Sequence, residues 1–401
     1  MNTLDRQQVL KDPLYGYIHI DDVIIKKLID TSLFQRLRRI RQLSGVQMVF
    51  HGAEHSRFTH SLGVYELAFR FLSVKELNET LDERSQLLFK TSALLHDIGH
   101  GAYSHAFEDV FKVDHEQIGA RMITNRFEIR DILATVDKDF AKDVASIILK
   151  EGRFPIIEHL ISSQIDIDRL DYLERDAYYT GTAYGHIDLD RLMRVMHIKD
   201  GKIIFSVSGI HAIENYLISR YHMYWQVYYH PVARAYEVIL EKIYLRVKNL
   251  YLKDFEFKAD IEPLKRLIEN PNDLDSFIQI DDFFINGLIS SFTKSKDDIL
   301  KTLADDFLNR HIWKYIDDNK ANQELINHIK ATYDQQELEY FTAHKTVSNR
   351  AYQNDKADIG DQIDILLKDQ SVSTLEEQSD IMNGLMLSGV KEDKKFFYRP
   401  L

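Results

Sequence analysis

His96 and Asp97 stand side by side at the end of an apolar run, in the stretch TSALLHDIGHGAYSHAF. Adjacent helical residues project about 100° apart, so both side chains reach one point only if it lies beside the turn they share. A divalent metal suits such a point, and Mg, Mn, Fe, Ni and Zn all accept an imidazole with a carboxylate. The dipeptide alone indicates little, because a histidine at a helix end beside a surface acid is common.

Two further stretches strengthen the metal hypothesis. Upstream, HGAEHSRFTHSLGVYELA places three histidines before a new apolar run, at His51, His55 and His60. Downstream, QIDIDRLDYLERDAYYTG carries four aspartates, at Asp166, Asp168, Asp171 and Asp176. Acids among apolar neighbours are costly to bury unpaired, and a metal with basic neighbours would remove that cost. One histidine, the His-Asp pair and a later aspartate would leave open positions for water and substrate, which is typical of catalytic metal sites.

Composition restricts the class of protein. The chain has 401 residues, of which 44% are hydrophobic and 28% charged, as in soluble globular proteins. It has no cysteine, which excludes disulfides, thiolate ligands and cysteine nucleophiles. Neither a signal peptide nor a membrane-spanning apolar run is found, so we expect a cytoplasmic protein without a membrane partner. The net charge of −12 makes nucleic acid an unexpected partner.

Hydrophobic periodicity predicts a mainly α fold. Apolar residues recur three and four apart over 23–43, 84–96 and 213–252, the second helix being expected to end at glycine. Strands are expected at 15–20 and 338–347, and a hairpin over 195–207 with a type I′ turn at Asp200-Gly201. Acidic, turn-rich sequence begins after about residue 252. We therefore expect a helical domain at 1–252, with an N-terminal regulatory segment at 1–45, and a smaller α+β region at 253–401.

Four motifs in order resemble a known family. HSRFTHSLGVYELA, LLHDIGHGAYSHAFE, VDHEQIGA and DIDRLDYLERD resemble the HD-domain phosphohydrolases. More narrowly, they are similar to the deoxynucleoside triphosphate triphosphohydrolases, a group that includes bacterial members and the mammalian SAM-and-HD-domain enzyme. The resemblance runs from about Lys11 to beyond His230 and implies an HD-domain helical bundle that hydrolyses dNTPs to deoxynucleoside and triphosphate. It also implies four metal ligands, at His60, His96, Asp97 and Asp168.

The same resemblance assigns the groups that act on the scissile phosphate. Glu108 follows His105 by one helical turn and would orient its imidazole, although the family usually has aspartate there. His105 is then the expected proton donor to the leaving 5′-oxygen. His100 and His115 are expected to bind oxygens of the α-phosphate.

Substrate contacts are implied in the same way. Arg57, Arg169 and Arg220 match phosphate contacts, while Tyr172 and Asp176 match residues that hold the 3′-hydroxyl. Tyr228 would lie under the ribose and leave no room for a 2′-hydroxyl. The remaining expected contacts are Gln42 and Leu43 at the sugar edge and Tyr224 and His230 in the lining.

An allosteric nucleotide site is implied near the N-terminus. Asp30, Gln35 and Arg38 match residues that read guanine, and Lys11 stands where the mammalian enzyme has asparagine. The resemblance implies dGTP or GTP as a possible activator and assembly into a homotetramer. The basic cluster of Arg36, Arg38, Arg39 and Arg41 would then serve a nucleotide; the alternative is ordinary pairing on a solvated helix surface.

Three other functions are open at this point. The first is an HD phosphodiesterase or guanosine tetraphosphate hydrolase, but the GYP segment and the acids after the HD pair that mark those branches are missing. The second is a catalytically silent nucleotide sensor, which the intact set of expected ligands disfavours. The third is single-strand binding in a basic groove, which the acidic charge balance disfavours.

Overall fold

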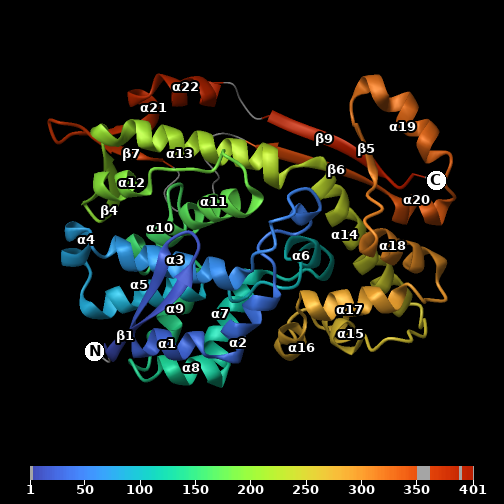
Figure 1. The fold of residues 1–401 in the computed structure, drawn as a ribbon, viewed down its shortest axis with the longest axis horizontal. Coiled ribbons are helices and arrows are strands. Elements are labelled where there is room, and N and C mark those ends of the chain that lie inside the picture. Colours follow the sequence, from blue (N-terminus) through green and yellow to red (C-terminus); the bar gives the residue numbers. More distant parts are fainter. Residues whose placement is uncertain (1–2, 350–361, 388–390, 401) are drawn as a thin grey trace.

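The structure is a computed structural model that describes residues 3–349, 362–387 and 391–400. It is mainly helical, as predicted, and its short strands lie around the helical body (Figure 1). They form sheets of two, four and three strands, in the orders β1-β2, β3-β4-β7-β8 and β5-β9-β6. No helix within the described ranges combines the length and apolar character needed to cross a bilayer.

The chain begins with an antiparallel hairpin beside the helical body. β2 (Gly16–Asp22) is the strand expected from alternation, and it buries Ile18 and Ile20 against the core. Its partner β1 (Thr3–Asp12) was not predicted, because TLDRQQVLKD has no apolar alternation and pairs mainly through its backbone. The helix expected at 23–43 breaks at Thr31, whose hydroxyl accepts from the amide of Phe34. The resulting pieces are α1 (Val23–Ile29), α2 (Ser32–Arg36) and η1 (Leu37–Arg39), and η2 (Val46–Met48) follows beyond the predicted helix.

The helical body packs α5 (Glu83–Leu95) and α11 (Ile167–Thr180) against α3 (Arg57–Phe71). α3 is buried on nearly every side, which is why its apolar residues show so little one-sided periodicity. α5 ends at Leu95, before the glycine expected to stop it, so His96 and Asp97 lie at the helix end. The other helices here are α4 (Lys75–Thr80), α6 (His105–Phe111), α7 (His115–Asn125), α8 (Phe127–Leu133), α9 (Phe140–Ile148) and α10 (Pro155–Ile161).

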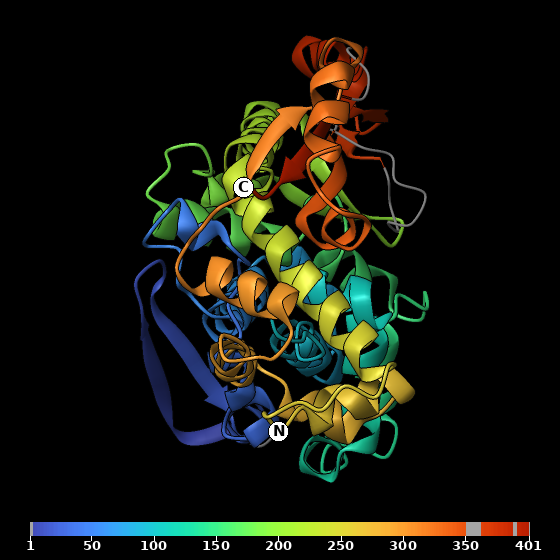
Figure 2. The same cartoon turned by 90° about the vertical axis from the view of Figure 1, so that its right-hand side faces the viewer.

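The predicted hairpin and long helices follow. β3 (Met196–Lys199) and β4 (Lys202–Ser206) pair around Asp200 and Gly201, whose φ angles of +51° and +74° are those of a type I′ turn. The helix expected over 213–252 is interrupted by a π-helical turn, η4 (Tyr224–Tyr228), between α13 (Ile210–Met223) and α14 (Pro231–Tyr251). α14 crosses the body diagonally in Figure 2. α12 (Leu189–Val195) and η3 (Val207–Gly209) complete this part.

The C-terminal part is α+β. The strand expected at 338–347 begins only at Thr342, because the capping box of Asp334 and Glu337 starts a helix that runs through Phe341. The helices are α15 (Glu262–Glu269), α16 (Leu274–Gln279), α17 (Asp282–Phe292), α18 (Asp298–Leu308), η5 (Lys320–Asn322), α19 (Gln323–Lys330), α20 (Gln335–Phe341), α21 (Leu375–Gln378) and α22 (Asp380–Leu387). The strands are β5 (Lys314–Asp317), β6 (Thr342–Asn349), β7 (Asp364–Leu366), β8 (Val372–Thr374) and β9 (Lys391–Tyr398).

One hydrophobic cluster contains buried residues from both sides of residue 252, among them Ile243 and Phe307. A buried guanidinium, that of Arg36, also connects the two parts. It donates to the carbonyl oxygens of His100 at 2.9 Å, Ile280 at 2.9 Å and Ile278 at 3.1 Å. Arg36 is 1% exposed, so it belongs to the interior and not to a solvated basic helix face.

We predict that Arg36→Met lowers the free energy of unfolding by roughly 3 kcal/mol or more, because each buried carbonyl left unpaired costs about 1–3 kcal/mol. Urea unfolding monitored by far-UV circular dichroism would measure the change. Arg38→Met is the matched control, since Arg38 is exposed. Equal stability of the two variants would contradict the proposed structural role of Arg36.

Candidate functional site

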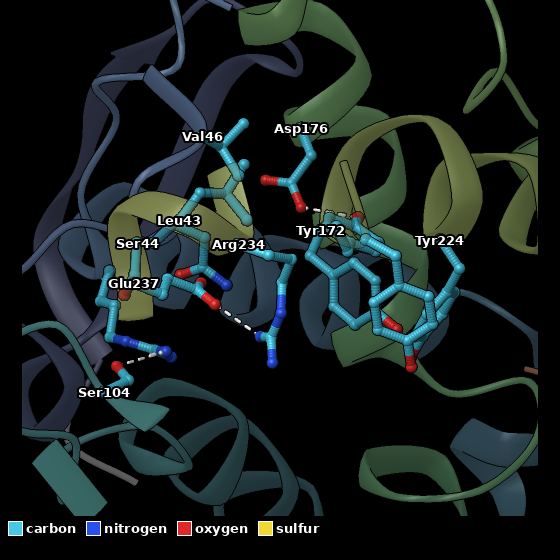
Figure 3. A pocket seen from close by; sticks show the side chains of 13 residues that line it. Leu43, Ser44, Val46, Ser104, Tyr172, Asp176, Tyr224, Arg234 and Glu237 are labelled. Carbon is cyan, nitrogen blue, oxygen red and sulfur yellow. Dashed lines mark hydrogen bonds and ion pairs between the residues drawn. The ribbon is translucent and has the colours of Figure 1, made fainter. Parts of the chain in front are cut away.

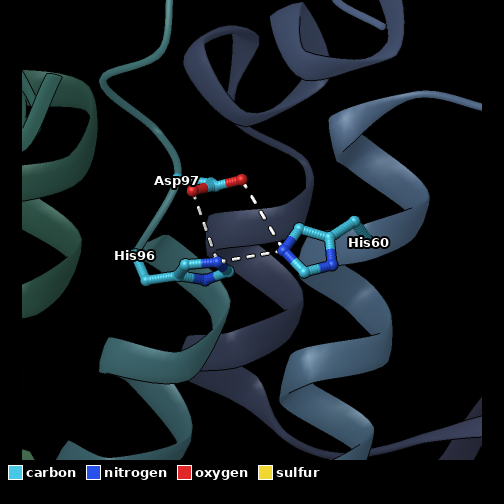
Figure 4. Close-up of side chains that lie close together, drawn as sticks. All are labelled: His60, His96 and Asp97. Carbon is cyan, nitrogen blue, oxygen red and sulfur yellow. Dashed lines mark hydrogen bonds and ion pairs between the residues drawn. The ribbon is translucent and has the colours of Figure 1, made fainter. Parts of the chain in front are cut away.

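Four side chains expected as metal ligands converge on one point in the helical body. His60 comes from α3, His96 and Asp97 from the end of α5, and Asp168 from the first turn of α11. Nε2 of His60 lies 3.2 Å from Nε2 of His96 and 3.0 Å from Oδ1 of Asp168. Asp97 places one carboxylate oxygen 3.7 Å from Nε2 of His60 and the other 3.4 Å from Nε2 of His96 (Figure 4). The arrangement directs two nitrogens and two carboxylates at a shared space.

Outer contacts fix how the two imidazoles point. Nδ1 of His60 lies 2.8 Å from Oδ2 of Asp171, and Nδ1 of His96 lies 2.8 Å from the carbonyl oxygen of Ala93. Each Nδ1 therefore carries the proton that an acceptor requires, which leaves Nε2 free to bind a cation. Asp171 is held in turn by Arg175, whose Nε and Nη2 donate to its two oxygens at 2.8 and 2.9 Å.

The electrostatics of the cluster fit a divalent cation. Burial alone lowers the pKa of His60, but its bonds to Asp168 and Asp171 prevail and raise it to about 10. Burial raises the pKa of Asp168, yet hydrogen bonds from His60 and His96 hold it far below its ordinary value. The carboxylates of this cluster thus require positive charge beside them. Protons on the histidines supply that charge, and a divalent metal could replace those protons.

A second cluster adjoins the first. Glu108 in α6 places Oε1 3.2 Å from Nδ1 of His100 and Oε2 3.2 Å from Nδ1 of His115. The two imidazoles are stacked, with centroids 3.9 Å apart, and Nε2 of His100 lies 3.2 Å from Asp97. Glu108 was predicted to orient His105; its two oxygens contact His100 and His115, and its contact with His105 stays a prediction. The side chain of His105 lies outside the described residues.

The two stacked histidines have opposite pKa shifts. Burial lowers the pKa of His100, and the charges of Arg57 and His115 lower it further. Burial also lowers the pKa of His115, but the hydrogen bond and the charge of Glu108 outweigh burial and raise the pKa of His115 above its ordinary value. The environments of the two rings thus push their pKa values apart, which is typical of groups that act as acid and base.

The glycines of HDIGHG permit a close approach between this loop and α7. A Cβ on Gly99 would lie 2.0 Å from the carbonyl oxygen of His115 and 2.4 Å from the amide nitrogen of Gly119. Only glycine fits this position without moving the backbone. The close approach brings His115 to the stack with His100.

A cavity of about 310 Å³ is lined by the side chains drawn in Figure 3. Seven predicted substrate-binding residues line it, namely Gln42, Leu43, Arg57, Tyr172, Asp176, Tyr224 and Tyr228. Six lining residues were not predicted, namely Ser44, Val46, Ser104, Tyr229, Arg234 and Glu237. Of these, only Arg234 and Glu237 carried a usable signal, an oppositely charged pair three apart on one helix.

Arg57 connects the cavity to the first cluster. Its Nη1 donates to Oδ2 of Asp97 at 2.5 Å and its Nη2 to Oγ of Ser104 at 2.9 Å. A ligand in the cavity would therefore contact a cation that also touches the clustered carboxylates. This is the geometry expected where a negatively charged group of the ligand approaches a metal.

Three predicted contacts lie outside the cavity lining. Nη1 of Arg169 donates to Asp166 at 2.7 Å, and Nη1 of Arg220 donates to Gln164 at 2.9 Å. Burial and then the charge of Tyr224 raise the pKa of Tyr172, and the charges of both arginines oppose that rise. His230 is the N-cap of α14, where its Nδ1 accepts from the amide of Val232 at 3.3 Å.

The residues predicted to form an allosteric site lie near the surface. Nε of Arg38 donates to Oε1 of Gln35 at 2.8 Å, and its guanidinium stacks on Phe58. Asp30 is the exposed C-cap of α1, and Lys11 is exposed on the hairpin with its ammonium over the ring of Tyr17. Pairing of Gln35 with Arg38 is what the helix-surface alternative expected, and it does not prevent either side chain from binding a ligand.

Comparisons with known proteins agree with this geometry. The HD domain matches residues 57–176, and the HD associated region matches residues 187–260. YwfO, an uncharacterized protein of Bacillus subtilis, is 43% identical over 330 residues, which span 82% of this chain and 76% of that protein. The deoxynucleoside triphosphate triphosphohydrolase SAMHD1 of Mus musculus is 26% identical over 375 residues, which span 80% of this chain and 56% of the mouse protein. A phosphohydrolase from Bacteroides thetaiotaomicron has a TM-score of 0.86 at 29% identity, covering 98% of this chain and 100% of that one.

We predict that Gly63→Ala weakens metal binding about 10- to 100-fold, the range found when outer contacts of a ligand are lost. A Cβ there would lie 1.9 Å from Oδ1 of Asp171 and 2.3 Å from Nη2 of Arg175, so it must displace the pair that orients His60. Calorimetric titration with Mn²⁺ would measure the change. The control is Gly287→Ala, where a Cβ meets open space. Unchanged affinity in Gly63→Ala would contradict this role of Asp171.

We also predict that Glu108→Gln lowers the pKa of His115, because the carboxylate that stabilises the imidazolium is lost. NMR titration of the histidine side chains would follow the change. Asp109→Asn alters an exposed acid on the same helix and should leave the titration unaltered. An equal effect of both variants would show that general charge, not the Glu108 bond, governs His115.

Proposed function

The chain belongs to the HD-domain phosphohydrolase family and carries its HD associated region, and from this premise we propose that it hydrolyses deoxynucleoside triphosphates to deoxynucleoside and inorganic triphosphate. The observation that carries the proposal is the continuity of the four-residue cluster with the cavity through Arg57. The similarity to SAMHD1 of Mus musculus, whose name states this activity, favours the same substrate class.

His60, His96, Asp97 and Asp168 are the residues proposed to hold the metal, and their nitrogen and carboxylate donors fit Mg, Mn, Fe, Ni or Zn. When bound, the metal would supply Lewis acidity toward a phosphoryl oxygen and a water of lowered pKa. Arg57 lies between this cluster and the cavity. Its guanidinium binds Asp97 on one side and is proposed to contact the phosphate on the other. Arg169 and Arg220 extend the positive charge past Tyr172.

The second cluster supplies proton chemistry. When the bond between the α-phosphorus and the 5′-oxygen breaks, the deoxynucleoside leaves as an alkoxide that must be protonated. The family resemblance assigns this protonation to His105. His115 with its raised pKa is suited to neutralise a phosphoryl oxygen, and neutral His100 can donate or accept beside it. Glu108 contacts Nδ1 of both rings and holds them in place.

The cavity size and lining suit a nucleoside. About 310 Å³ lies at the lower end of the range of small-molecule sites, ~300–1,000 Å³. Asp176 and Tyr172 are proposed to bind the 3′-hydroxyl, with Tyr228 against the position of a 2′-hydroxyl and Gln42 and Leu43 at the sugar edge. Tyr224 and His230 stand at either end of the aromatic turn that forms the remaining wall.

Activation by dGTP or GTP at Lys11, Asp30, Gln35 and Arg38, within a cytoplasmic homotetramer, completes the proposal. A continuous series of contacts supports coupling from this region to the metal cluster. Asp12, next to Lys11, accepts from Nη1 of Arg175 at 2.9 Å, and Arg175 holds Asp171, which contacts His60. A nucleotide that shifts the hairpin would therefore act on a proposed metal ligand.

Product analysis tests the reaction. Metal-loaded protein is incubated with dATP, dCTP, dGTP and dTTP, each alone and then with dGTP or GTP added. We expect free triphosphate with deoxynucleoside, and faster release when the guanine nucleotide is present. Pyrophosphate, monophosphate or no product in every combination would contradict the proposed reaction.

Replacement of a proposed ligand tests the metal. We predict that His96→Ala lowers kcat on the order of a thousandfold, because Lewis acidity supplies several kcal/mol of transition-state stabilisation. Metal content measured by mass spectrometry should fall in parallel. His51→Ala is the control, since His51 is exposed. Full activity of a metal-depleted His96→Ala protein would exclude the metal from the reaction.

A further inference from the structure

Asp176 has both of its carboxylate oxygens engaged. Oδ2 accepts from the phenol of Tyr228 at 2.7 Å, and Oδ1 lies 2.7 Å from Nε2 of His55. Asp176 and Tyr228 line the cavity, whereas His55 lies behind them and does not. Since a carboxylate can only accept, Nε2 of His55 carries the proton of this bond.

His55 is held rigidly where it meets Asp176. Its ring stacks on that of Tyr179, with centroids 4.5 Å apart and planes 15° apart. Its carbonyl oxygen accepts from the amide of Gln42 at 3.0 Å, and Gln42 is also part of the cavity wall. The side chain is 0% exposed. The imidazole therefore cannot follow Asp176 if that carboxylate moves, and it instead sets the position of the carboxylate.

Within the described ranges, the imidazole has no second hydrogen-bond partner. Its Nδ1 is buried and has no hydrogen-bond partner among the described residues. A buried polar atom without a partner costs free energy, and an apolar side chain in this stacked position would avoid that cost. The structure thus retains a histidine at a position where its only polar contact in the described chain is Asp176, which indicates that this contact serves the cavity.

We propose that His55 is a positioning residue for sugar selection, an inference that rests on the proposed function. By fixing Asp176, it directs the free lone pairs of the carboxylate at the 3′-hydroxyl. Through Asp176 it also fixes the phenol of Tyr228, which closes the space that a 2′-hydroxyl would need. Loss of the His55 donor lets the carboxylate rotate and releases Tyr228, so both kinds of sugar discrimination weaken together.

The test compares three sugars in the full-length, metal-loaded protein. kcat/KM is measured for a deoxynucleoside triphosphate, its 2′,3′-dideoxy analogue and its ribose analogue. Dissociation constants of the three corresponding nucleosides, which lack the scissile bond, are measured alongside. His55→Phe keeps a ring against Tyr179 without the donor, His55→Gln keeps an N–H donor, and His51→Ala changes an exposed histidine nearby.

We expect the wild type to favour the deoxy sugar over both others, and His55→Phe to reduce each preference about tenfold, as loss of one hydrogen bond to a charged group does. His55→Gln should recover part of the preference, and His51→Ala should keep all of it. Metal affinity and melting temperature should change little in any variant.

The proposal would be overturned by unchanged sugar ratios in His55→Phe, or by an equal loss for all three sugars in both His55 variants. A wild type that does not discriminate among the sugars would also overturn it. Failure of the proposed reaction is distinguishable, because no triphosphate would then be released from any nucleotide. The nucleoside dissociation constants would in that case still decide whether His55 sets the sugar preference.

Discussion

Neutralisation of buried carboxylates is the constraint on which the rest of the structure depends. Asp97 and Asp171 are buried in the helical body and Asp168 is partly buried beside them, and burial disfavours their charged forms. Each is nevertheless held below its ordinary pKa by an adjacent imidazole or guanidinium. Such a cluster is unstable if a single positive partner is removed, because an uncompensated buried charge costs several kcal/mol. The elements that supply those partners must therefore come together for the site to form.

Each positively charged partner of these carboxylates connects a different part of the fold to the proposed metal site. Arg57 brings the cavity wall to Asp97, and Arg175 brings the N-terminal hairpin to Asp171 through Asp12. Arg36 acts in the same way without a carboxylate, because its guanidinium holds the backbone of His100 to the C-terminal part. The proposed chemistry, sugar selection and activation are thus three consequences of one network, and a change in any partner should reach the others.

The sequence predicted the four clustered residues through the resemblance of four motifs in order, because the His-Asp pair alone indicates little. It also predicted the I′ hairpin, which Asp200-Gly201 specifies locally. It missed β1, whose pairing is set by the backbone and not by alternating side chains. It did not predict the contact of Glu108 with His115, because helical spacing says nothing of His115, which arrives from α7 through the close approach at Gly99. Ser44 lies just before the short helix η2 and Val46 begins it, in a stretch without periodicity, so their place in the cavity depends on tertiary packing.

The location of the bound metal tests the central claim most directly, because two adjacent histidine-carboxylate clusters could each hold an ion. Anomalous diffraction from a crystal grown with Mn²⁺ would locate it. We predict one ion between Nε2 of His60, Nε2 of His96 and the carboxylates of Asp97 and Asp168. An ion bound instead by His100, Glu108 and His115, or no ion at either cluster, would contradict the claim.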